Sequence, residues 1–161
     1  MGLNIIEPIG ALPTRVDTVQ AFKLGTTAST SDGKEYRYVQ ASGAITGAGY
    51  AAVVNVESWL AIQATTANAA AKIGWLVGFA MAAMATGEYG WLQVKGAASI
   101  EVFASCAAGV RINTTATSGA LDDDATVGAR AIDGATLTTA RAASQGSANA
   151  VLSDCRVGAT I

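Results

Sequence analysis

The chain has 161 residues, of which only 14% are charged, against about 25% in ordinary globular proteins. Its net charge is −2, and its ten Lys and Arg residues are scattered, so there is no basic stripe to neutralise nucleic-acid phosphates. The longest apolar run, residues 73–85, is too short for a membrane-spanning helix, which needs about 20 residues. The composition therefore argues against nucleic-acid and membrane partners and favours a protein that packs against other protein.

The first 21 residues are predicted to form an extended arm. Both prolines of the chain, Pro8 and Pro13, lie in this segment and bias the residues before them toward extended backbone. The segment lacks the basic start and the long apolar stretch of a secretory signal, so we expect the chain to fold in the cytoplasm where it is made. The predicted organisation is an arm at residues 1–21 and a single β-rich domain at residues 22–161.

The domain is predicted to begin with a β-hairpin. Strand signals occupy residues 19–24 and 35–40, and an Asp-Gly turn pair at 32–33 lies in the polar loop between them. The alternation of the second strand places Tyr36 and Tyr38 on one face of the hairpin.

The middle of the chain is less regular. Residues 50–60 are strand-like, and the alanine and threonine stretch at 61–71 allows a short helix. Residues 73–84 are ambiguous in period, but their β-branched and aromatic side chains favour a buried strand followed by a turn.

The second half of the chain alternates with a period of two. Trp91, Gln93 and Lys95 fall on one side of an extended chain and Leu92 and Val94 on the other. Further short strands are predicted at residues 90–95, 98–104, 109–115, 129–132, 135–139 and 148–152. Strands at this spacing predict an all-β fold, as a small antiparallel β-barrel or a β-sandwich.

Groups that carry catalysis or bind metal are sparse. The chain contains no histidine, which removes the commonest acid-base group and the commonest zinc ligand. Asp122, Asp123 and Asp124 form the one dense acidic cluster, but their spacing is not that of a calcium loop, and a solvated turn is the preferred interpretation. Cys106 and Cys155 are expected to be buried free thiols, because the cytoplasm is reducing.

Paired carboxylates and clustered aromatic residues allow functional interpretations, and each also has a structural one. Glu88 with Glu101, or Asp133 with Asp154, is the type of pair that glycoside hydrolysis requires, but nothing in the sequence sets their separation. The aromatic residues would suit a sugar-stacking platform but are more typical of core and interface anchors. These are Tyr36, Tyr38, Tyr50, Trp59, Trp75, Tyr89 and Trp91. The sequence therefore predicts no enzyme, and no catalytic, cofactor or metal site.

One long stretch carries a resemblance to a known family. The segments YGWLQVKG (89–96), CAAG (106–109), TTATSGALDDD (114–124) and IDG (132–134) follow FKLGTTASTSDGKEYRYVQASGAI near the start. Together they resemble the capsid decoration, or cement, proteins of tailed bacteriophages over most of residues 22–157. The arm at residues 1–21 does not clearly match.

The resemblance implies a β-tulip-like structural module without a cofactor, found on the capsid exterior of the virion. Its implied partners are the major capsid protein and other copies of the same chain, as a homotrimer, on the expanded head. We expect the arm and residues 73–84 to make these contacts. The predicted contact residues are Ile5, Ile6, Pro8, Ile9, Leu12, Pro13, Trp75, Leu76, Phe79, Met81 and Met84.

Three other functions remain open at this stage. A tail-fibre or head-fibre module that binds a receptor glycan would also be β-rich, although the chain has no internal repeat of the kind that fibre shafts carry. A glycan hydrolase using Glu88 or Glu101 is a weaker alternative. The third alternative is a closed barrel that holds a small apolar ligand.

Overall fold

The computed structural model describes residues 12–116, 118–124 and 126–161, and it is nearly all β, with 47% of residues in strands and 3% in helix. The prediction of an all-β fold is confirmed. The elements are β1 (Thr27–Ser29), β2 (Glu35–Ala41), β3 (Ala51–Asn55), β4 (Leu60–Gln63), α1 (Thr66–Ala69), β5 (Leu76–Ala80), β6 (Tyr89–Val102), β7 (Arg130–Leu137) and β8 (Gly146–Thr160).

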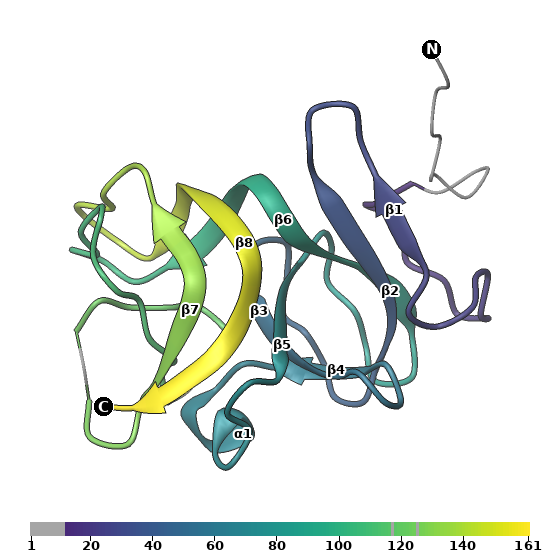
Figure 1. The fold of residues 1–161 in the computed structure, drawn as a ribbon, viewed down its shortest axis with the longest axis horizontal. Helices are drawn as coiled ribbons and strands as arrows, with labels where there is room; N and C mark the ends of the chain where they lie inside the picture. Colours follow the sequence, from purple (N-terminus) through teal and green to yellow (C-terminus); the bar gives the residue numbers. More distant parts are fainter. Residues whose placement is uncertain (1–11, 117, 125) are drawn as a thin grey trace.

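The strands form one sheet in the order β1-β2-β4-β3-β5-β6-β8-β7. A further pairing of β2 with β6 closes a ring of hydrogen bonds through β2, β4, β3, β5 and β6. The strand pairs are antiparallel, with the exception of β2 and β4, which run parallel where Gln40 faces Leu60. Figure 1 shows β7 and β8 at one side of the molecule and the β1–β2 hairpin at the other, with β6 between them.

Strand β6 joins the two sides because it changes partners along its length. From Tyr89 to Lys95 it pairs with β2, and from Lys95 to Val102 it pairs with β8. The change falls at Gly96, whose φ of +90° suits glycine, and a Cβ there would come within 2.9 Å of the Gly33 carbonyl oxygen. The sequence predicted two short strands here, because the small residues after Lys95 resemble a turn.

The core has three parts, which follow from this strand arrangement. One cluster draws on all five strands of the ring, with Val39, Val54 and Leu92 among its members. The largest cluster lies under β7, β8 and the second half of β6, where Ile100 and Leu152 are buried. The third is aromatic and packs Tyr36, Tyr38 and Trp91 together with the half-buried Phe22.

Several predicted elements have different bounds in the structure. The first hairpin strand is β1 and not residues 19–24, and the strand-like segment 50–60 is divided into β3 and the start of β4 by a turn. The short helix predicted within 61–71 is present as α1, with Thr65 as its N-cap. Residues 109–115 do not form a regular strand and make only isolated bridges. The predicted strands at 129–132 and 135–139 are one strand, β7.

Candidate functional site

The predicted contact residues fall into three groups in the structure. Ile5, Ile6, Pro8 and Ile9 lie outside the described residues. Leu12 is 61% exposed and Pro13 is half-buried, at the start of the described chain. The third group comes from residues 73–84 and is mostly buried.

Leu76, Phe79 and Met84 have their side chains in the core of the chain itself, each at most 4% exposed. They therefore offer nothing to a partner while the fold is intact, and this part of the contact prediction needs correction. The physical reason is that β5 has core on both faces, since Leu76 packs in the ring cluster and Phe79 in the cluster under β8. An apolar run of this kind cannot show by its period that neither face is free.

Trp75 and Met81 flank β5 and are only half-buried. Met81 packs against the aromatic cluster. The indole of Trp75 packs against the largest core cluster on one side, and Lys72 Nζ lies 5.0 Å from its ring centroid. Of the five predicted contact residues in this run, these two reach the surface.

We group Trp75 with Val56, which lines the same pocket along with Asn55 and Glu57, and with Ile73, which lies two residues before Trp75 in the chain, and call these three residues the 56/73/75 patch. Ile73 is 65% exposed and Val56 is 45% exposed. Val56 and Trp75 line one pocket of about 180 Å³, together with Gly74. Val56 was missed at the sequence level, because the segment containing it was assigned to a strand interior instead of the turn between β3 and β4.

The loop before β5, which carries Ile73 and Trp75, is fastened to β8. Gly74 N–H donates to the Val157 carbonyl at 2.7 Å, and Val157 N–H donates to the Trp75 carbonyl at 2.9 Å. Arg156 adds a contact from its Nη1 to the Gly74 carbonyl at 3.4 Å. The backbone at Gly74 and Trp75, in the loop that joins α1 to β5 (Figure 1), is therefore held in place by β8.

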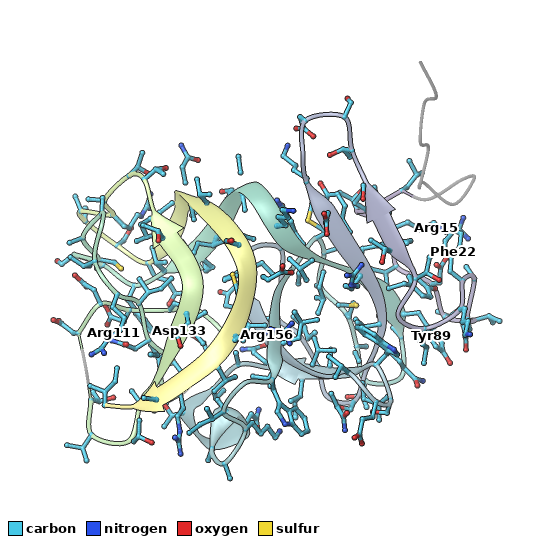
Figure 2. All side chains as sticks on the ribbon, viewed as in Figure 1. Arg15, Phe22, Tyr89, Arg111, Asp133 and Arg156 are labelled. Atoms are coloured by element: carbon cyan, nitrogen blue, oxygen red, sulfur yellow. The ribbon has the colours of Figure 1, made fainter. Side chains whose placement is uncertain are left out.

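The described part of the N-terminal segment packs against the domain through Asp17. Its backbone pairs with Tyr89 by two hydrogen bonds of 2.9 Å, and its carboxylate accepts from Tyr38 Oη at 2.9 Å. Arg15 Nε lies 2.5 Å from the same carboxylate. Figure 2 shows Arg15, Phe22 and Tyr89 on one side of the molecule.

Asp17 is only 6% exposed, and burial raises the pKa of its partner Tyr38. The predicted boundary between residues 21 and 22 therefore does not separate the described part of the arm from the domain. Nothing in the sequence around Asp17 signals this contact, because its partners lie 21 and 72 residues further along the chain.

A wider groove lies where β6 bends away from β2. It has a volume of about 540 Å³ and is lined by residues of the β1–β2 hairpin, of β6 and of β8, among them Tyr36, Gln93 and Asn149. The Gln93 side chain is held in place, because its Nε2 donates to the carbonyls of Lys95 and Ala97. Tyr36 and Gln93 are nearly buried beneath the groove, at 5% and 4% exposed, whereas the Asn149 side chain is exposed.

Of the two carboxylate pairs considered for glycoside hydrolysis, Glu88 and Glu101 lie near opposite ends of β6. Glu88 precedes β6 and caps the turn at Ala85, whose N–H it accepts at 2.7 Å. Glu101 lies near the other end of this fourteen-residue strand and accepts from Gln145 and Ser147. Asp133 and Asp154 are both exposed, on the neighbouring strands β7 and β8.

The two cysteines are buried free thiols. Burial raises the pKa of Cys106 to about 12, with a further contribution from the Asp123 carboxylate, and burial raises the pKa of Cys155 to about 11. Both groups are therefore protonated at neutral pH and poorly nucleophilic.

Comparison with known proteins adds no relative, since no family model and no curated protein matches this sequence. Across the described ranges, none of the helices has the length and apolar character needed to cross a membrane.

Proposed function

We propose that this chain is a capsid decoration protein of a tailed bacteriophage, which binds the exterior of the expanded head together with other copies of itself. The major capsid protein is the partner, and a homotrimer is the binding unit. The resemblance over residues 22–157 supports this function, and so does the low charge of the chain. Such a protein acts by binding alone.

The structural observation that carries the proposal is the 56/73/75 patch. Grouped exposed apolar side chains are typical of protein contact sites, whereas single ones are common on any surface. Here Ile73 is exposed on the loop that carries the half-buried Trp75 and is fastened to β8, and Val56 is exposed on the turn between β3 and β4. Large aromatic side chains are typical of the residues that contribute most to binding energy.

The energetic role follows from mass action. A protein that binds the expanded shell, and neither its precursor nor its dissociated subunits, stabilises the shell by RT ln(1 + [L]/Kd) at each site. This amounts to about 2.7 kcal/mol at a hundredfold excess over Kd. Many such sites on one head would oppose the internal pressure of packaged DNA.

The test is co-sedimentation of the purified protein with expanded empty heads and with unexpanded precursor heads, counting bound copies per capsid protein. We expect saturable binding to expanded heads alone. Ile73→Asp should weaken this binding at least about tenfold, because it places a charge in the contact. Val127→Asp is the matched control, since Val127 is fully exposed at another place and should tolerate the same change.

Two results would contradict the proposal. Absence of saturable binding to expanded heads by the folded protein would remove the function itself. Equal binding by wild type and Ile73→Asp would leave the function intact but place the contact away from the 56/73/75 patch.

A receptor-binding module is the second candidate, and the groove beside β6 favours it. The groove offers the exposed side chains of Ser99 and Asn149 and the half-buried Lys34, which are suited to hydrogen bonding with a sugar. A screen against bacterial surface glycans distinguishes the two functions. Binding of a glycan that is lost in Asn149→Ala, without binding to heads, would favour the receptor-binding module.

A further inference from the structure

Side chains with metal-ligating atoms converge in the loops between β6 and β7. The Cys106 sulfur and one carboxylate oxygen each from Asp122 and Asp123 all lie within 4.8 Å of one another. Asp122 and Asp123 are half-buried, unlike the solvated turn that the sequence favoured for them. Two oxygens bound to the same Ca²⁺ at about 2.3–2.6 Å lie at most about 5 Å apart, so the carboxylate spacing is compatible with one ion.

The carboxylates are placed by backbone pairing and not by cations of the protein. Asn113 N–H donates to the Asp122 carbonyl at 2.7 Å, and Asp122 N–H donates to the Asn113 carbonyl at 3.0 Å. Asp123 Oδ2 accepts from Ala107 N–H at 3.0 Å. In the part of the chain that the structure describes, no Lys or Arg forms an ion pair with either carboxylate.

Asn113 supplies an independent observation. Its side chain is 1% exposed, and its Oδ1 is buried without a hydrogen-bond partner. Leaving a buried acceptor of this kind unsatisfied is unfavourable, so it calls for an explanation. Asn113 and Asp122 are directly opposed in an antiparallel bridge, so their side chains project from the same face. Asn113 Nδ2 also donates to the Asp123 carbonyl at 3.5 Å, which holds the amide against the carboxylate loop.

We propose that Asp122, Asp123 and Asn113 Oδ1 bind a divalent cation that prefers oxygen ligands, Ca²⁺ before Mg²⁺. Carboxylate and amide oxygens are the usual calcium ligands, and Ca²⁺ accepts irregular geometry where Mg²⁺ requires a near-ideal octahedron. Of the proposed ligands, Asp122 lines a pocket of about 200 Å³ together with Thr114 and Thr115, so water can reach the ion from this side.

The donor set favours an oxygen-seeking ion. The group of side chains offers two carboxylates and one sulfur, that of Cys106. Structural Zn²⁺ sites are usually completed by four Cys or His ligands, and the chain has no histidine and only two cysteines.

The test measures thermal unfolding of the full chain, freed of metal with a chelator, as CaCl₂, MgCl₂ or ZnCl₂ is added. We expect Ca²⁺ to raise Tm saturably, by roughly 5–10 °C at a hundredfold excess over Kd. Asp122→Asn and Asp123→Asn keep the side-chain shape and should lose this rise. Asp133→Asn, an exposed change on β7, is the control and should keep it.

Calcium titration calorimetry of the same proteins gives a second readout that does not depend on stability. If neither Tm nor heat responds to Ca²⁺ in the wild type, the proposal is overturned, and the Asn113 amide is then turned so that Nδ2 donates to Asp122. A response to Zn²⁺ alone that is lost in Cys106→Ser would overturn the assignment to an oxygen-seeking ion. A response to Mg²⁺ but not Ca²⁺ would overturn the stated order of preference. None of these outcomes depends on the proposed function.

Discussion

Asp17 shows at the scale of one residue how a buried charge fixes the course of the chain. The cost of burying its carboxylate is offset by Arg15, by the Tyr38 hydroxyl and by the backbone pairing with Tyr89. The Tyr38 ring in turn packs against Phe22 and Trp91, at centroid distances of 5.3 and 5.1 Å. The aromatic cluster therefore determines where the N-terminal segment meets the domain.

Tyr38→Phe is predicted to lower the free energy of unfolding by about 1.5–3 kcal/mol, because it leaves a buried carboxylate without one of its donors. Tyr50→Phe is the matched control. The Tyr50 hydroxyl accepts from Gln145 at an exposed site, so its loss should change stability by no more than about 0.5 kcal/mol. Urea denaturation of both variants measures the difference, and equal midpoints would contradict this account of Asp17.

At the scale of the element, local patterns predicted the strands better than the faces that stay exposed. The alternation in β2 placed Tyr36 and Tyr38 on one face, and both pack in the aromatic cluster, while Val39 on the other face is buried in the ring cluster. Residues 76–80 form the predicted buried strand, yet the same burial removes Leu76 and Phe79 as contact residues. The sequence therefore located the strand but not the 56/73/75 patch, which depends on a turn and a loop meeting in space.

The pairing of β7 with β8 was not predictable for a related reason. The register shifts between Asp133 and Ala135, and Gly134 occupies this bulge with φ of +86°. The sequence signal was therefore two short strands separated at the glycine, where the structure has one bulged strand. Long-range register of this kind leaves no local trace in composition.

Gly134→Ala is predicted to destabilise the protein more than Gly87→Ala. Both positions have φ near +90°, so both changes carry a backbone strain of about 1–2 kcal/mol. A Cβ at Gly134 would lie 2.5 Å from the Ser153 carbonyl oxygen, whereas a Cβ at Gly87 would point into open space. The clash should add about 1–3 kcal/mol, and thermal unfolding of the pair measures it. Equal losses of stability would show that β7 adjusts to the added methyl group without a measurable loss of free energy.

At the scale of the whole molecule, the proposed contact patch and the anchor of the N-terminal segment lie at separate places on one sheet. The 56/73/75 patch lies next to α1, and the Asp17 anchor lies beside the aromatic cluster on the ring side. Residues 12–21 belong structurally to the domain, so an arm that reaches a neighbouring subunit would have to consist of the residues before them.

Deletion of residues 1–11 is therefore predicted to leave Tm within about 2 °C of the wild type, while weakening binding to expanded heads. A deletion extended through residue 17 should also lower Tm, because it removes Val16, which packs on the ring cluster, and the Asp17 anchor. Differential scanning calorimetry and co-sedimentation separate the two effects. Unchanged head binding by the shorter deletion would show that residues 1–11 make no contact with the shell.

The position of β8 has a consequence for how the protein is made. This strand spans Gly146–Thr160, later in sequence than all the others, yet it lies inside the sheet between β6 and β7. The ring closed by β2 and β6 needs only residues up to about 95, so it can form during synthesis, when chains grow at about 5–20 residues per second. The core under β7 and β8 must wait until the ribosome has delivered β8, and until then the apolar side chains that β3, β5 and β6 contribute to that core stay exposed.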